Sequence, residues 1–204
     1  MTEFPQHPWF PLETERLILR EFRQSDLDDV HAYGSDAIVS QFMDWGPNTP
    51  EVSQTFLSLQ IEGQKTWPRK DVSLAIERRE TGKMIGSIRL WVVQEDWGTA
   101  EIGYSLDRGH WRRGFASEAA SAMMRAGFEV LKLHRIVATC DVRNRGSWSV
   151  MRKLGMRREG KLMQDRLIKG HWRDTYSYAI LANEWRARSK QYYPDIIDSK
   201  HGGT

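Results

Sequence analysis

A Gly-centred turn with two adjacent arginines lies between a predicted strand and a predicted helix. Arg112 and Arg113 come directly before Gly114, and the helix opens at Phe115. Glycine at a helix start lets the backbone approach a ligand closely, and the first N–H groups of a helix have no partner within it. Together with the helix dipole, such N–H groups bind anions. The turn therefore indicates a ligand with phosphate groups, although a tight turn with two solvated arginines would use the same residues.

A second polar stretch follows the next predicted strand. Asn144 leaves that strand, and Ser147 is predicted to be the N-cap of a short helix that stops at Gly155. A turn Asn and a capping Ser are common, so this stretch alone indicates no chemistry. The two stretches together, in this order and about thirty residues apart, are far less expected by chance than either stretch alone.

The elements that would position these turns follow from the hydrophobic periodicity. Alternating apolar residues predict strands over 16–22, 71–78, 84–93, 99–106 and 135–142, and two more on either side of Lys169 and Gly170. Helical spacing predicts helices that begin near Ser25 and Thr49, others over 115–131 and 147–154, and a short helix with a loose tail over 183–201. The order predicts one α/β domain with a mixed sheet over 1–204, with its core at 12–185 and a tail at 186–204.

The composition is that of a globular protein, with 40% hydrophobic and 28% charged residues. No apolar run approaches the ~20 residues that cross a bilayer, and the first residues lack the pattern of a secretion signal. The single cysteine, Cys140, favours a reducing compartment and predicts a cytoplasmic location. It lies inside a predicted strand, which argues against a nucleophilic role. No Cys/His spacing indicates a metal site.

Charge is distributed unevenly along the chain. Residues 1–107 carry 10 basic and 18 acidic side chains, whereas residues 108–161 carry 13 basic and 4 acidic ones. This asymmetry predicts two ligand surfaces of opposite preference, with a scatter of solvated charges as the alternative.

Together these stretches resemble the GNAT superfamily of acetyl-CoA-dependent N-acetyltransferases, and within it the branch of the RimJ and RimL ribosomal-protein N-terminal acetyltransferases. The resemblance covers residues 12–185 and rests on LETERLILREF, IGYSLDRGHWRRGFASEA, HRIVATCDVRNRGSWSVMRKLGM and GHWRDTYSYAILANEW. The second segment resembles the family's acetyl-CoA signature, written Arg/Gln-x-x-Gly-x-Gly/Ala. Trp111 stands at its first position, which departs from the pattern.

The resemblance implies a GNAT fold, an α/β (α+β mixed) domain with a mostly antiparallel twisted sheet of about seven strands. Strands 99–106 and 135–142 would splay apart around the pantetheine arm of acetyl-CoA, and the amides at 113–117 would hold its pyrophosphate. The implied cofactor-binding residues are Ile102, Tyr104, Leu106, Arg112, Arg113, Gly114, Phe115, Ala116, Ser117 and Asn144. Basic residues that would help to hold the 3′-phosphate are Arg143, Arg145, Arg152 and Lys153. No metal is implied.

Acetyl transfer to a primary amine requires a neutral amine, a polarised thioester carbonyl and a protonated leaving thiolate. The resemblance favours Glu101 as the general base, acting through an ordered water, and Ser147 as the general acid near the sulfur. An exposed strand carboxylate and a helix cap are the alternative interpretations of these two residues. Glu77 and Asp107 are reserve bases, and Tyr104 is a weaker candidate for the acid.

The acceptor amine is expected to enter through the N-terminal half of the chain. Phe42 and Trp45 would line its pocket or cover the core. Acidic residues of this half predict a rim that attracts a cationic amine: Asp26, Asp28, Asp29, Asp36, Asp44, Glu51 and Glu62.

The expected function is direct acetyl transfer to a primary amine, with a protein N-terminal α-amine as the leading acceptor. The alternatives are a small-molecule acetyltransferase that acts on a polyamine or antibiotic, and a non-catalytic acyl-CoA sensor. No membrane partner is expected. Nucleic acid is not expected either, because the arginines of the basic segment have no interleaved aromatic platform beyond Trp111 and Trp148, and the coenzyme explains the charge. The resemblance implies a monomer or a homodimer.

Overall fold

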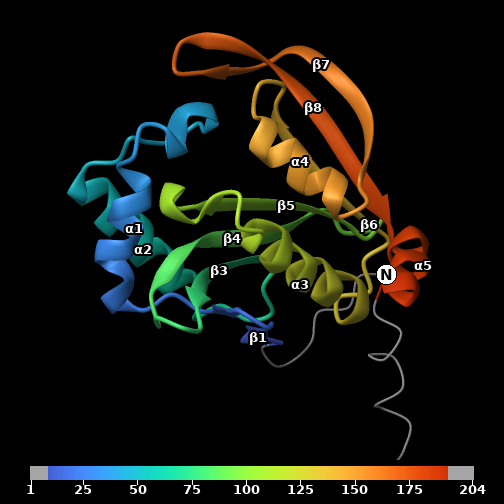
Figure 1. Cartoon of the computed structure of the whole chain (residues 1–204), viewed down its shortest axis with the longest axis horizontal. Helices are drawn as coiled ribbons and strands as arrows, with labels where there is room; N and C mark the ends of the chain where they lie inside the picture. The colour runs from blue at the N-terminus through green and yellow to red at the C-terminus, as the bar shows by residue number, and fades with distance from the viewer. Residues whose placement is uncertain (1–8, 193–204) are drawn as a thin grey trace, which may run out of the picture.

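The structure is a computed structural model that describes residues 9–192, with side chains described to residue 188. Its centre is an eight-stranded sheet in the order β1-β2-β3-β4-β5-β6-β8-β7 (Figure 1). Neighbouring strands are antiparallel except β5 and β6, which are parallel. The strands are β1 (Leu12–Glu13), β2 (Leu17–Arg20), β3 (Asp71–Arg78), β4 (Met84–Gln94), β5 (Thr99–Leu106), β6 (Arg135–Asp141), β7 (Arg157–Ile168) and β8 (His171–Leu181).

Helices cover both faces of the sheet. The α-helices are α1 (Leu27–Gly34), α2 (Pro50–Gly63), α3 (Phe115–Glu129), α4 (Arg145–Lys153) and α5 (Ala182–Tyr192), and the short 3-10 helices are η1 (Gln24–Asp26), η2 (Val39–Phe42) and η3 (Arg108–His110). None of the helices within 9–192 is long and apolar enough to cross a membrane.

The alternation of β3 places its residues in two separate hydrophobic clusters. Leu74 and Ile76 belong to the larger cluster, which includes Met123 of α3, whereas Ala75 belongs to a smaller cluster with Leu57 of α2. Successive residues of a strand point to opposite faces, so one strand contributes to both layers. The sheet is therefore held between α3 on one face and the α1–α2 pair on the other.

Most predicted elements are confirmed, several to the residue. Strands β3 and β5 have the predicted bounds, and α2 begins at Pro50 with Thr49 as its N-cap, whose side chain accepts from the Val52 N–H. The GNAT-type mixed, mostly antiparallel sheet is also confirmed, with eight strands. The predicted helix at 183–201 is described only as α5, and its remainder lies outside the described residues.

Two predicted helix caps are wrong. Ser25 lies inside η1, and α1 begins at Leu27. The Asp26 carboxylate instead pairs with Arg20 in the interior and accepts from the Arg23 N–H. This ion pair fixes the chain direction at the start of α1, so no capping serine is needed.

The cap of α4 is Asn144 rather than Ser147. The Asn144 side-chain oxygen accepts from the Ser147 N–H at 3.1 Å, and the helix begins at Arg145. Asn and Ser cap helices about equally well, so the pattern could not choose between them. The Ser147 hydroxyl is therefore not used to cap the helix and remains available for another hydrogen bond.

Candidate active site

The sheet opens between β5 and β6. The two strands pair only where Thr99–Glu101 lies beside Arg135–Val137, and beyond this point both continue without pairing to each other. Strand β6 stays paired with β8 as far as Asp141, so β5 has a free edge from Ile102 onward. The predicted splay of strands 99–106 and 135–142 is thus present.

A cavity of about 140 Å³ lies at the splay, and we call it the central cavity. Its lining includes Ile102 and Tyr104 of β5, Cys140 of β6, and Asn144, Ser147 and Met151 at α4. The predicted cofactor residues of β5 and the start of α4 therefore come together at one place.

The Gly114 turn leaves the first amides of α3 free. Gly114 has φ +83°, a left-handed conformation that favours glycine, and no side chain caps the helix. The first helical bond runs from the Glu118 N–H to the Gly114 carbonyl, so the amides of 115–117 precede the hydrogen-bonded ladder. Arg112 and Arg113 are exposed next to them. This arrangement can bind an anion such as a pyrophosphate.

Arg16 and Glu118 anchor this turn to β2. Arg16 donates to the Arg113 carbonyl at 3.1 Å and to Glu118, and its guanidinium lies 4.5 Å from the centre of the Phe115 ring. Burial acts to raise the pKa of Glu118, but hydrogen bonds from Thr14 and Arg16 outweigh it and hold that pKa below its ordinary value. Phe115 is itself buried, so it offers a ligand its amide rather than its ring.

Trp111, which departs from the family signature, closes the turn onto β5. Its indole Nε1 donates to the Leu106 carbonyl at 2.8 Å. One acceptor position at the end of β5 is therefore already occupied. The free edge for a ligand is concentrated at Ile102 and Tyr104, whereas Leu106 serves to hold the turn.

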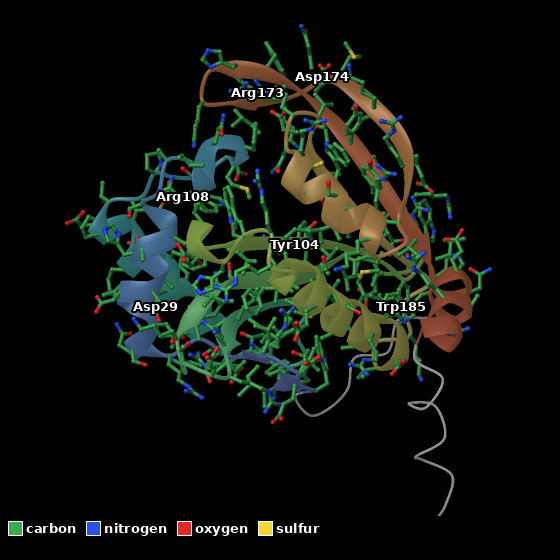
Figure 2. The ribbon with its side chains drawn as sticks, viewed as in Figure 1. Asp29, Tyr104, Arg108, Arg173, Asp174 and Trp185 are labelled. Carbon is green, nitrogen blue, oxygen red and sulfur yellow. The ribbon has the colours of Figure 1, made fainter. Side chains whose placement is uncertain are left out.

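Tyr104 lies at the centre of the molecule (Figure 2). Its hydroxyl donates to the Ser147 carbonyl at 3.1 Å and lies 3.5 Å from the Ser147 Oγ. Burial raises the pKa of Tyr104 well above its ordinary value, and only the nearby Ser147 opposes this. The phenol is therefore protonated at neutral pH and can donate a proton. The sequence favoured Ser147 over Tyr104 as the general acid. In the structure, the two hydroxyl oxygens lie 3.5 Å apart.

Cys140 also faces the central cavity, but its thiol is not activated. Burial raises the pKa of Cys140 to about 11, with a weaker opposing effect of Ser147. The thiolate is the nucleophilic form, so this cysteine is inert at neutral pH.

Glu101 lies beside the central cavity rather than in its lining. Its Oε1 accepts from the Thr139 hydroxyl at 2.8 Å, and Thr139 lines the cavity. The reserve bases lie elsewhere, Glu77 in an ion pair with Arg20 and Asp107 within hydrogen-bonding distance of His110 Nδ1, at 2.8 Å. Glu101 therefore has the nearest carboxylate of the three, one residue removed from the cavity.

A second and wider cavity of about 790 Å³ shares the lining residues Met43, Gly103 and Tyr104 with the central cavity. We call it the acceptor cavity, because Trp45, which was expected in the acceptor pocket, lines it. Aromatic side chains from both sides of the cavity line it: Tyr33, Trp45, Phe56 and Trp91. Trp45 thus lines this cavity, whereas Phe42 lines the central one.

The predicted acidic rim is not assembled. None of its seven residues lines the acceptor cavity, and one of them, Asp44, lines the central cavity instead. Asp26 pairs with Arg20, Asp36 with Arg108 and Glu62 with Lys65. The only acidic residue in the lining is Asp71, which pairs with Arg89, and the lining also contains Arg69 and Lys70. Sequence reasoning missed these residues because β3 and β4 carry no motif.

Known proteins resemble this chain over most of its length. The family described as "Acetyltransferase (GNAT) domain" matches residues 16–157. An uncharacterized N-acetyltransferase of Bacillus subtilis, YnaD, is 37% identical over 85% of this chain and 98% of the relative. The Escherichia coli spermidine N(1)-acetyltransferase is 25% identical over 84% of this chain and 89% of the relative. The crystal structure of a GNAT-family acetyltransferase from Bacillus anthracis superposes with a TM-score of 0.75, at 34% identity over 84% of this chain and 98% of that one.

Proposed function

We propose a role for each side of the site, starting from the premise that this chain belongs to the GNAT family of acetyltransferases. Membership makes it an N-acetyltransferase with acetyl-CoA as co-substrate. In the proposal, the free edge of β5 at Ile102 and Tyr104 binds the pantetheine arm, and Asn144 contacts its acetyl end. The amides of Phe115, Ala116 and Ser117, with Arg112, Arg113 and the Gly114 turn, bind the pyrophosphate.

The proton transfers follow from the groups at the splay. The acceptor nitrogen forms a bond to the thioester carbonyl carbon, the carbon–sulfur bond breaks, and the amine loses a proton while the sulfur gains one. Glu101 receives the amine proton through an ordered water near Thr139. The hydroxyl of Tyr104 or of Ser147 supplies the proton to the sulfur, which is supported by the position of both residues in the lining of the central cavity. The raised pKa of Tyr104 keeps its phenol protonated.

The proposed acceptor is a protein N-terminal α-amine, as in the RimJ and RimL branch. The observation that carries this choice is the acceptor cavity, which is wide, aromatic and joined to the central cavity beside Tyr104. The cations of its lining are each paired with a carboxylate, Arg69 with Glu21, Lys70 with Glu95 and Arg89 with Asp71. The one acidic lining residue, Asp71, is thus already paired, which gives a polycation such as a polyamine no free carboxylate to bind in this lining. A peptide presents one reacting amine followed by side chains that fit an aromatic pocket.

A cytoplasmic location belongs to the same proposal. It is supported by Cys140, a free and half-buried thiol whose pKa is raised by burial. Such a thiol needs no oxidising compartment.

The test is a mass-detected acetylation assay with acetyl-CoA and a mixed acceptor panel. The panel holds peptides with Ser, Ala and Thr N-termini, spermidine, aminoglycosides and free amino acids. The proposal predicts that only the peptides gain an acetyl group, at their N-terminus. Modification of only the small amines would replace the protein acceptor by a small molecule. Tight binding of acetyl-CoA without any product would favour the sensor instead.

A further inference from the structure

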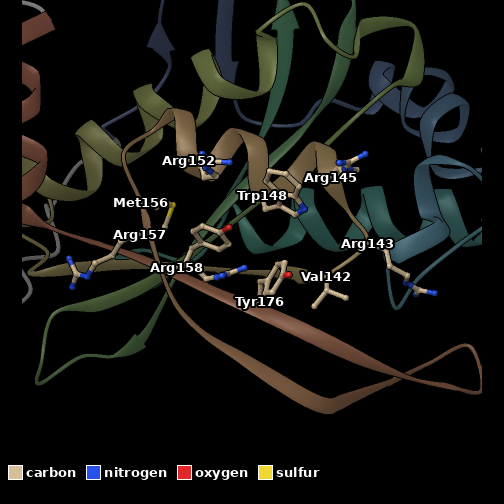
Figure 3. A pocket seen from close by; sticks show the side chains of 10 residues that line it. Val142, Arg143, Arg145, Trp148, Arg152, Met156, Arg157, Arg158 and Tyr176 are labelled. Atoms are coloured by element: carbon tan, nitrogen blue, oxygen red, sulfur yellow. The ribbon is translucent and has the colours of Figure 1, made fainter.

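A third cavity, of about 700 Å³, lies between α4 and the β7–β8 hairpin (Figure 3). We call it the arginine cavity, because half of its lining residues are arginines. The arginines are Arg143, Arg145, Arg152, Arg157 and Arg158. The other lining residues are Val142, Trp148, Met156, Tyr176 and Tyr178, and no carboxylate is among them.

The arginine cavity is separate from the active site. It shares no lining residue with the central or acceptor cavity. Helix α4 lies between it and α3, whose N-terminus holds the anion site (Figure 3). Ser147 and Met151 of α4 face the central cavity, whereas Trp148 and Arg152 face the arginine cavity. Three of the four residues expected at the coenzyme 3′-phosphate thus lie around a different cavity, and Lys153 lies outside its lining.

The positive charge of this cavity is largely uncompensated. Arg143 pairs with Asp141, and Arg157 pairs with Glu159 and Glu184. In the part of the chain whose side chains the structure describes, no carboxylate forms an ion pair with Arg145, Arg152 or Arg158. Arg145, Arg152 and Arg158 thus line one cavity without a carboxylate partner among the described side chains, so an anion in the cavity would be attracted to them.

Aromatic planes lie next to these free arginines. The Arg152 guanidinium is 5.9 Å from the Trp148 ring centre, and the Arg158 guanidinium is 4.7 Å from that of Tyr176. Tyr176 and Tyr178 make an edge contact with centroids 6.4 Å apart. Trp148 and Tyr176 are each only half-buried, so their rings can receive a planar group.

We propose that the arginine cavity binds a nucleotide, with its base stacked on Trp148 or Tyr176 and its phosphates paired with Arg145, Arg152 and Arg158. An acidic peptide would satisfy the arginines but would leave the aromatic planes without a role. A base beside phosphates satisfies both. The nucleotide is either free or part of a single-stranded RNA. The sequence led to the opposite expectation because Tyr176 and Tyr178 lie on β8, outside the basic segment.

The test uses the full chain with saturating acetyl-CoA, which occupies the cofactor site. Binding of a labelled single-stranded RNA octamer is followed by fluorescence anisotropy, and binding of ATP by calorimetry. The double variant R152Q/R158Q is expected to weaken binding by at least about tenfold, because two charge-assisted phosphate contacts are lost. Arg186→Gln, an exposed arginine of α5 outside the cavity, is the matched control and is expected to change Kd by less than about twofold.

A second variant tests the stacking without changing charge. Tyr176→Leu is expected to weaken binding of ATP by about fivefold or more and to leave binding of inorganic triphosphate unchanged. For RNA, log Kd is expected to rise with log salt with a slope of about 2, from three phosphate contacts.

The outcomes separate the two sources of the nucleotide. RNA binding without ATP binding supports single-stranded RNA as the ligand, and ATP binding alone supports a free nucleotide. Displacement by acetyl-CoA would place the ligand in the cofactor site and overturn the proposal. So would equal binding of poly-glutamate and RNA, a control variant as weak as the double variant, or no binding of either nucleotide ligand at low salt.

Discussion

The two sides of Tyr104, proposed to bind the cofactor and the acceptor, differ in whether backbone groups or side chains line them. On the cofactor side, one short segment, 99–117, supplies a free strand edge and free helix amides, so most of the binding groups belong to the backbone. On the acceptor side, the lining comes from α1, α2, β3, β4, β5 and the η2–α2 and α2–β3 loops. Backbone sites tolerate side-chain changes, whereas the acceptor cavity takes its character from each residue that lines it. Cofactor and acceptor specificity can therefore change independently in this fold.

The largest effect is expected where the two sides meet. Tyr104→Phe removes the proton donor beside Ser147 and should lower kcat about 100-fold, within the range for general acid catalysis. KM for acetyl-CoA should change little, because the ring remains. Steady-state kinetics with the best peptide acceptor measures both. A variant with normal kcat and raised KM would make Tyr104 a binding residue only.

Gly114→Val tests the backbone side. The left-handed φ at Gly114 costs a non-glycine residue roughly 1–2 kcal/mol, and its Cβ would lie 3.3 Å from the Arg16 guanidinium. The turn should deform, and KM for acetyl-CoA should rise about tenfold with the acceptor KM unchanged. Gly82→Val is the control, because Gly82 has φ +66° in the hairpin turn before β4 and nothing lies within 4 Å of the position of its Cβ. An equal effect of both variants would mean a general loss of stability.

Trp45→Ala tests the acceptor side. Removal of this ring from the acceptor cavity should raise the acceptor KM about tenfold and leave KM for acetyl-CoA unchanged. Trp97→Ala is the control, because Trp97 is 68% exposed outside the site. A rise in KM for acetyl-CoA alone would contradict the division into two sides.

The smallest effect is expected for Glu118, which anchors the Gly114 turn through Arg16. Because the folded pKa of Glu118 lies below its ordinary value, its stabilisation is fully present above about pH 4.5 and is lost as the pH falls through the folded pKa. Glu118→Gln should lower Tm at pH 7 by about 5 °C through lost charged hydrogen bonds. The difference from the unmodified chain should shrink below pH 4.5, as measured by thermal denaturation. A difference that grows in acid would have the wrong sign.

The sequence could predict features that depend on neighbouring residues better than features that depend on contacts made through the fold. The Gly114 turn and the Thr49 cap depend on contiguous residues, so their patterns carried the information. The splay of β5 and β6 was expected only from the resemblance to the GNAT superfamily. The cap of α4 was missed because Asn144 and Ser147 are both good caps. The acidic rim was wrong because acidic residues in the first half of the chain have other partners. Glu62 pairs with Lys65 at the helical spacing i,i+3, which the sequence could have indicated, whereas Asp26 and Asp36 pair with Arg20 and Arg108 through the fold.

The most direct test of the account is the affinity of a bisubstrate conjugate, in which coenzyme A is joined through an acetyl bridge to the N-terminus of a Ser-initiated peptide. If both sides meet at Tyr104 and transfer is direct, the conjugate should bind at least about 100-fold more tightly than acetyl-CoA, because one molecule makes the contacts of both substrates. A spermidine conjugate should bind more weakly than the peptide conjugate. A peptide conjugate that binds no more tightly than acetyl-CoA itself would contradict the account.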